Sequence, residues 1–188
     1  MEKLRGLSPQ LTYHCLEHTV DVLKQSQRIA KEEGIKDNES LFLLKIASLY
    51  HDTGFLFVYA GHEARSCEMA QQELRDYGVA EDQIDKICGM IMATKIPQSP
   101  TNKLEQIICD ADLDYLGRTD FEFISNNLFK EFLVFGFVKD YDDWMQKQIG
   151  FFGVHQYFTK SSQQLRHPEK MKHFAQLKLY TPVGNGKV

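Results

Sequence analysis

The sequence predicts an all-α fold, because apolar residues recur at helical spacing along most of the chain. It contains no strand-like alternation of useful length, no internal repeat and no low-complexity segment. Hydrophobic residues make up 43% and charged residues 26% of the 188 residues, a composition typical of an ordinary globular protein. This length fits one domain, over residues 1–188, with a substantial core.

Five helices are expected before residue 118, over about residues 10–33, 38–51, 63–77, 81–94 and 103–116. Glycines at typical helix stops follow four of these segments: Gly34, Gly54, Gly78 and Gly117. Asp37 or Asn38 can cap the second helix, which is apolar almost all round and is therefore predicted to lie at the centre of the fold. Pro97 and Pro100 impose a loop before the fifth helix.

Aromatic residues concentrate in the last third of the chain, where helices are expected over about residues 120–138, 141–159 and 168–179. Nine of the 13 phenylalanines lie between Phe121 and Phe158, close to the single tryptophan, Trp144. Their spacing is first of all a helix-packing pattern. A surface that stacks on substrate or forms a homodimer is the alternative.

Composition excludes several classes of protein. The net charge of −4 argues against a surface that coats nucleic acid, although a small anionic substrate remains compatible. The N-terminus lacks an apolar stretch resembling a signal peptide, and no run approaches the roughly 20 apolar residues of a membrane span. The four cysteines form no Cys-x-x-Cys pair, which favours reduced thiols. We expect a cytoplasmic protein with no membrane association.

The pair His51-Asp52 stands at the end of the most apolar helix, where an imidazole and a carboxylate are costly to bury without a partner. A divalent metal would satisfy both groups, whereas an isolated pair would more often cap a helix end. The pair is not isolated, because His18 and Asp112 lie on the apolar stripes of the first and fifth helices. Three helices are thus predicted to deliver metal-ligand side chains to the interior.

The order His … His-Asp … Asp on successive helices resembles the HD superfamily of metal-dependent phosphohydrolases. The resemblance covers about residues 13–117 and rests on three segments, Tyr13-His-Cys-Leu-Glu-His-Thr-Val, Ala47-Ser-Leu-Tyr-His-Asp-Thr-Gly and Ile108-Cys-Asp-Ala-Asp-Leu-Asp-Tyr-Leu-Gly. It implies an HD-type helical bundle over these residues, with additional C-terminal helices over about residues 118–180.

The resemblance also implies that His18, His51, Asp52 and Asp112 bind the metal. Asp110 and Asp114 flank the last ligand, and Asp112 is preferred because it follows Ala111, as in the Ala-Asp common in the family.

Some HD enzymes hold a second metal through further histidines, and His62 resembles the first of these. The position where a second histidine is expected holds Ala93 instead. We therefore expect one divalent metal ion per chain, with His62 acting as a catalytic residue that touches substrate or water. The nitrogen and oxygen ligands suit Mn, Fe, Co, Ni, Mg or Zn without choosing among them.

Phosphate chemistry also needs positive charge near the metal. Lys95, just past the fourth helix, is the best-placed candidate for a catalytic and substrate-binding cation, and Arg65 is a second substrate-binding candidate. The alternative for each is a solvated surface charge. His14 is expected to line the substrate pocket.

Two other functions compete with hydrolysis of a phosphate ester. The segment His14-Cys-Leu-Glu-His18 matches the His-x-x-Glu-His motif of inverted zinc peptidases, with Glu17 as general base. A non-catalytic HD-like module that binds a nucleotide or metal is the other alternative. The favoured function is hydrolysis of a nucleotide or similar small phosphate ester by metal-activated water, which Asp52 orients or deprotonates.

Overall fold

Residues 3–182 are described by a computed structural model, in which they form α-helices and short 3-10 helices with no strand. The all-α prediction is therefore confirmed. The first five helices are α1 (Leu16–Glu32), α2 (Asn38–Tyr50), α3 (His62–Asp76), α4 (Glu81–Ala93) and α5 (Lys103–Asp112). The remaining four are α6 (Phe121–Val134), α7 (Tyr141–Val154), α8 (Lys160–Leu165) and α9 (His167–Leu177). The 3-10 helices are η1 (Lys3–Gly6), η2 (Thr53–Leu56) and η3 (Asp114–Gly117).

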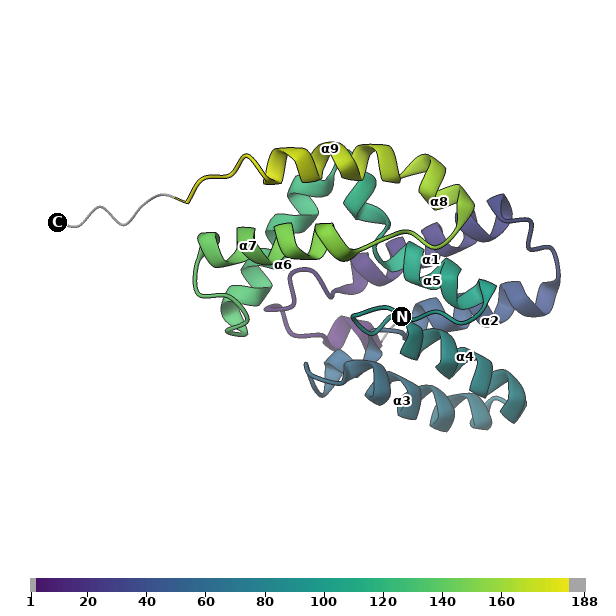
Figure 1. Cartoon of the computed structure of the whole chain (residues 1–188). Helices are drawn as coiled ribbons and strands as arrows, with labels where there is room; N and C mark the ends of the chain where they lie inside the picture. Colours follow the sequence, from purple (N-terminus) through teal and green to yellow (C-terminus); the bar gives the residue numbers. More distant parts are fainter. Residues whose placement is uncertain (1–2, 183–188) are drawn as a thin grey trace.

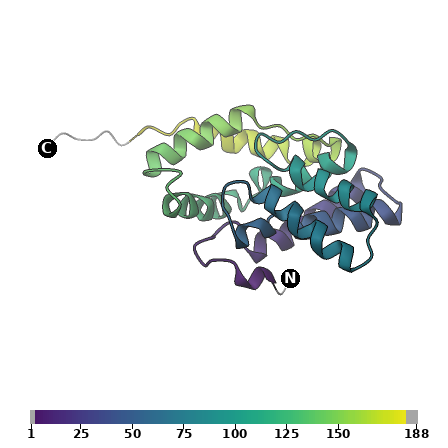
Figure 2. The same cartoon turned by 90° about the horizontal axis from the view of Figure 1, so that it is seen from below.

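Helices α1 to α5 pack around one apolar core, and α6 to α9 lie together on one side of them (Figures 1 and 2). Leu43, Leu44 and Ala47 of α2 are buried in that core, but Phe42 on the same helix is 42% exposed. Helix α2 therefore buries one face and does not lie at the centre of the fold, contrary to the prediction from its apolar sequence. The Asp37 side chain caps α2 by accepting a hydrogen bond of 2.7 Å from the backbone N–H of Ser40. No helix within residues 3–182 is both long enough and apolar enough to traverse a membrane.

The structure differs from the predicted helices at four places, one of which is the end of α6 at Val134 rather than near residue 138. The first helix begins at Leu16 rather than near residue 10, because the backbone N–H groups of Tyr13 and His14 donate to Glu131 instead of continuing a helix. The fifth helix ends at Asp112 and is followed by η3. Thr159 does not end α7 but caps the short helix α8, whose Ser162 N–H donates to its hydroxyl.

Buried carboxylates fasten the C-terminal helices to the first five. Asp110 accepts hydrogen bonds from the backbone N–H groups of Phe158 and Thr159, each 2.8 Å long. Asp114 is fully buried and accepts from Arg28 at 2.7 Å and from Arg166 at 2.9 Å. These contacts join α5 and η3 to α8 and to the start of α9, and so fix the C-terminal helices beside the ends of α1 and α5.

Candidate metal centre

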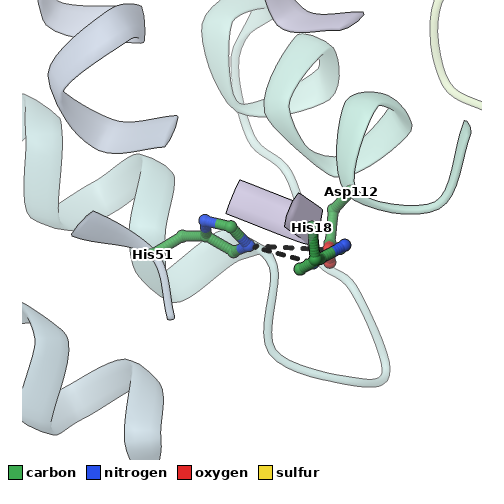
Figure 3. A group of neighbouring side chains, drawn as sticks. All are labelled: His18, His51 and Asp112. Carbon is green, nitrogen blue, oxygen red and sulfur yellow. Dashed lines mark hydrogen bonds and ion pairs between the residues drawn. The ribbon is translucent and has the colours of Figure 1, made fainter. Parts of the chain in front are cut away.

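Three helix ends bring His18, His51 and Asp112 to one point. His18 lies in the first turn of α1, His51 directly follows α2, and Asp112 is the last residue of α5. One nitrogen or oxygen atom from each lies within 4.8 Å of the others. Figure 3 shows the three side chains directed toward one another, with His18 Nε2 3.1 Å from Asp112 Oδ1.

Asp52 adds a fourth group to this point. Its Oδ2 atom lies 3.2 Å from Nε2 of His51 and 3.4 Å from Nε2 of His18. Within residues 3–182 this buried oxygen has no hydrogen-bond partner. A buried carboxylate oxygen without a partner is costly, and a cation placed among these four side chains would remove that cost.

The orientation of His51 also suits metal binding. Its Nδ1 lies 2.9 Å from the backbone carbonyl oxygen of Ser48. Because a carbonyl oxygen only accepts, Nδ1 carries the hydrogen, and the lone pair of the neutral ring is on Nε2. Nε2 faces His18 at 3.3 Å. Histidine ligands of metals are usually oriented in this way: one ring nitrogen binds the metal, and the other donates a hydrogen bond to a protein acceptor.

The carboxylates govern protonation of the cluster. Burial is the largest influence on His18 and lowers its pKa, but Asp112 and Asp52 together outweigh it and raise the pKa to about 10. Burial likewise opposes the charge on Asp52, yet His51 and His18 hold its pKa well below the ordinary value. The negative charge of the two carboxylates is thus balanced by protons on the histidine rings. A divalent cation could replace these protons. The buried imidazole nitrogens and carboxylate oxygens of the four side chains fit such an ion.

Comparison with known proteins identifies the family. The family model of the HD domain matches residues 15–114, more than half of the chain. The chain belongs to the HD domain family. HD domains bind divalent metals, and the cluster of His18, His51 and Asp112 can hold one. The family match coincides with the segment that carries the predicted ligands.

The fold of this HD-domain protein is similar to a solved structure. That structure is a crystal structure of a predicted HD superfamily hydrolase from an uncultured Thermotogales bacterium, with a TM-score of 0.60 and 19% identity. The likeness covers 95% of this chain and 90% of that chain, so the C-terminal helices are included. At this identity the likeness shows the fold alone. No curated protein matches the chain at a significant level.

The two aspartates that flank Asp112 are bound elsewhere. Asp110 holds the backbone before α8, and Asp114 is surrounded by arginines. Of the three aspartates, Asp112 is the one whose carboxylate lies beside His18 and His51.

His62 approaches the cluster from α3. Its Nδ1 lies 3.0 Å from the carbonyl oxygen of Tyr59, and its Nε2 lies 3.4 Å from Oδ1 of Asp52. The ring is stacked on Phe55, with ring centroids 3.9 Å apart. Asp52 therefore faces the two predicted histidine ligands with one oxygen and His62 with the other. The catalytic role of His62 stays a prediction that this placement supports.

His14 lines the same cavity as Asp52 and Asp112, as the sequence predicts for a pocket residue. Its ring also stacks on Phe55, with ring centroids 4.2 Å apart. Its Nδ1 pairs with the carboxylate of Glu131, which is fully buried on α6. Binding of substrate by His14 stays a prediction.

The two predicted cations lie away from the cluster. Lys95 is exposed and lines a separate pocket with Met92 and Glu105. Arg65 donates to Glu68 at 2.7 Å, and its guanidinium lies 4.5 Å from the centre of the Phe57 ring. Neither side chain lines the cavity that contains Asp52 and Asp112. Their roles in catalysis and substrate binding therefore stay predictions without a contact in this structure.

The sequence did not identify several residues that line this cavity of about 360 Å³. Those with polar side chains are Tyr13, Glu63, Thr94, Tyr115, Lys147 and Gln148. Glu63 had a local signal, because it adjoins His62 and is almost fully buried although acidic. Lys147 and Gln148 come from α7, and nothing in the local sequence connects that helix to the metal ligands.

Replacing Glu17 by glutamine is expected to change the rate of phosphate-ester hydrolysis by no more than about tenfold, roughly 1.4 kcal/mol. Glu17 is exposed, and His14, the other half of the peptidase motif, is paired with Glu131. The measurement is kcat/KM of the Glu17→Gln variant beside His18→Ala, which should lose far more. Loss of all activity in Glu17→Gln, with zinc still bound tightly, would favour the peptidase alternative.

Proposed function

We propose that this HD-domain protein is a metal-dependent phosphohydrolase that cleaves a phosphate ester of a nucleotide or similar small molecule. The observation that carries this proposal is the position of the predicted ligands at the wall of a cavity. Asp52 and Asp112 both line it, together with His62 and Glu63. A substrate in the cavity would therefore meet the metal ligands directly. The similar Thermotogales protein is itself described as a predicted hydrolase, which agrees with this proposal.

The residues of the chain can perform the remaining steps of hydrolysis. A metal held by His18, His51, Asp52 and Asp112 would supply a Lewis acid for the phosphate and a lowered pKa for the attacking water. Asp52, whose oxygens face His51 and His62, would orient the attacking water or accept its proton, as water adds to phosphorus and the ester P–O bond breaks. His62 lies beside Asp52, which raises its pKa against the opposing effect of burial. It can therefore deliver a proton to the leaving oxygen.

A panel of nucleotides and simple phosphate esters, each assayed with several divalent metals, tests the proposal. Release of inorganic phosphate from at least one of them, dependent on added metal and lost on chelation, is the expected result. Binding of metal and nucleotide without any turnover would favour the non-catalytic HD module instead.

Metal affinity is expected to rise with pH. The pKa of His18 is raised to about 10 in the metal-free protein, so this ring carries a proton at neutral pH that the metal must displace. Below that pKa the apparent affinity should increase about tenfold per pH unit for each proton released. Titrations with Co²⁺ between pH 6 and pH 8 would measure the slope, and calorimetry in two buffers would count the protons. An affinity that does not change with pH would contradict this account.

A further inference from the structure

The cavity beside the metal centre is apolar over most of its length. The carboxylates of Asp52 and Asp112 line its part at the metal centre, and η3, α6 and α7 supply a second part of its lining, called the distal wall below. The apolar and aromatic side chains of this distal wall are Leu116, Leu128, Phe132, Trp144, Phe151 and Phe152. Such a surface favours a flat or apolar group over one rich in hydroxyls.

Positive charge is scarce in this cavity. Among the described residues that line it, Lys147 is the one lysine or arginine, and its side chain is exposed. Three arginines outside this lining are bound to carboxylates: Arg28 and Arg166 to Asp114, and Arg118 to Asp120. Sites that bind polyphosphates usually surround them with several cations. The lining of this cavity can balance one phosphate group but not a chain of them.

Apart from the exposed Lys147, the polar side chain that α7 contributes to the distal wall, that of Gln148, is already engaged. The side-chain oxygen of Gln148 accepts a hydrogen bond of 2.7 Å from the hydroxyl of Ser125, and its nitrogen lies 3.6 Å from the sulfur of Met145. Elsewhere in the lining, at the end of α4, the hydroxyl of Thr94 donates to the carbonyl oxygen of Ile91 at 2.7 Å. A sugar bound against this wall would exchange its hydrogen bonds to water for few replacements, which disfavours it.

We propose that the substrate is a phosphate monoester of an apolar, ring-bearing alcohol. The inference rests on the phosphohydrolase function proposed above and narrows its substrate class. The phosphate lies beside Asp52 and Asp112, and the ring occupies the part of the cavity that Phe132, Trp144 and Phe151 line. Water adds to phosphorus, and the alcohol leaves with one proton, so inorganic phosphate and the free apolar alcohol are the products.

The monophosphates in the test are chosen as esters of primary alcohols, whose leaving groups are similarly reactive. A difference in kcat/KM among them then reports how well the cavity binds the alcohol. We would compare 2-phenylethyl phosphate with ribose 5-phosphate, adenosine monophosphate and adenosine triphosphate, using the metal that supports most activity. The kcat/KM for 2-phenylethyl phosphate is expected to exceed that for ribose 5-phosphate by about 30-fold or more, because apolar contacts discriminate at this level. The triphosphate is expected to be the poorest substrate.

A matched pair of variants on α6 assigns the preference to the distal wall. Phe132 lines the cavity and is half-buried, whereas Phe123 on the same helix is 71% exposed and lies outside it. Phe132→Asn should reduce the preference for the phenylethyl ester by about tenfold. Phe123→Asn should leave it unchanged. Melting curves of both variants show whether either has lost its fold, and the wild-type comparison needs no variant.

The possible outcomes separate the two proposals. Hydrolysis that favours ribose 5-phosphate or the triphosphate would overturn the substrate class and leave the phosphohydrolase function in place. An unchanged preference in folded Phe132→Asn would also overturn it. Absence of hydrolysis of every ester with every metal would refute the proposed function and the substrate class together.

Discussion

Replacing Asp52 by alanine, or His51 by alanine, is expected to abolish metal binding and to reduce phosphate-ester hydrolysis by at least about a thousand-fold, or about 4 kcal/mol. Asp52 contacts the cluster through both oxygens: Oδ2 faces His51 and His18, and Oδ1 faces His62. His51 is 1% exposed, so no other side chain can take its place without a rearrangement of the core. Elemental analysis and a phosphate-release assay on the purified variants measure the two effects.

Asp85→Ala is a suitable control for Asp52→Ala, because Asp85 is an exposed aspartate on α4 outside the cavity. It should retain full metal content and activity. Wild-type activity in either His51→Ala or Asp52→Ala would contradict the assignment of this cluster as the metal centre.

Replacing Glu131 by alanine is expected to destabilise the protein by about 3 kcal/mol and to impair hydrolysis as well. Glu131 is fully buried and accepts hydrogen bonds from the backbone N–H groups of Tyr13 and His14, at 2.9 and 3.1 Å. It also accepts one of 2.7 Å from the hydroxyl of Tyr59. Its loss would leave these donors buried without partners and release the segment that leads to His18. Urea denaturation and kcat/KM measure the two consequences.

The contribution of Glu131 should depend on pH. Burial opposes its charge, but the neighbouring His14 and Tyr59 outweigh burial and lower the pKa of Glu131 below its ordinary value. The stabilisation is therefore fully present above the ordinary pKa of glutamate and is lost as the pH falls through the lower value of the folded protein. Glu122→Ala, an exposed position on the same helix, is the control and should change stability little. Equal stability of the Glu131 and Glu122 variants would contradict this role.

Local sequence signals predicted most helices but not the places where distant groups intervene. Glycine stops and the Asp37 cap placed the ends of α1, α2 and α3 within a residue or two. The start of α1 was misplaced because Glu131, 118 residues away, binds the backbone of Tyr13. The separate helix α8 was missed for a similar reason, since the chain before it is held by Asp110.

The same distinction applies to the site. The sequence could indicate that the four side chains predicted as metal ligands lie together, because each is at a helix end or on an apolar stripe, within motifs that resemble the family; their binding of metal stays a prediction. The sequence offered a substrate-stacking aromatic surface only as an alternative and could not place it beside the metal ligands, because Trp144 and Phe151 reach the cavity only through the packing of α7. Lys95 and Arg65 were predicted near the site because of their positions in the sequence. Where such long charged side chains point is determined by local contacts and solvent: Arg65 pairs with Glu68, and Lys95 is exposed.

The number of metal ions depends on how Asp52 is used. Its second oxygen faces His62, yet the position where the family can supply another histidine is the buried Ala93. Alanine cannot coordinate a metal. We therefore expect one firmly bound ion per chain, with His62 acting on substrate or water.

A crystal structure of the metal-loaded protein, with anomalous-scattering data recorded at the absorption edge of the metal, tests the central claim most directly. We predict a single peak per chain enclosed by His18, His51, Asp52 and Asp112, together with about one equivalent of metal by elemental analysis after dialysis. Paired peaks that include His62 would contradict the expected stoichiometry. A metal held between His14 and His18, or no metal among these four side chains, would contradict the metal centre itself.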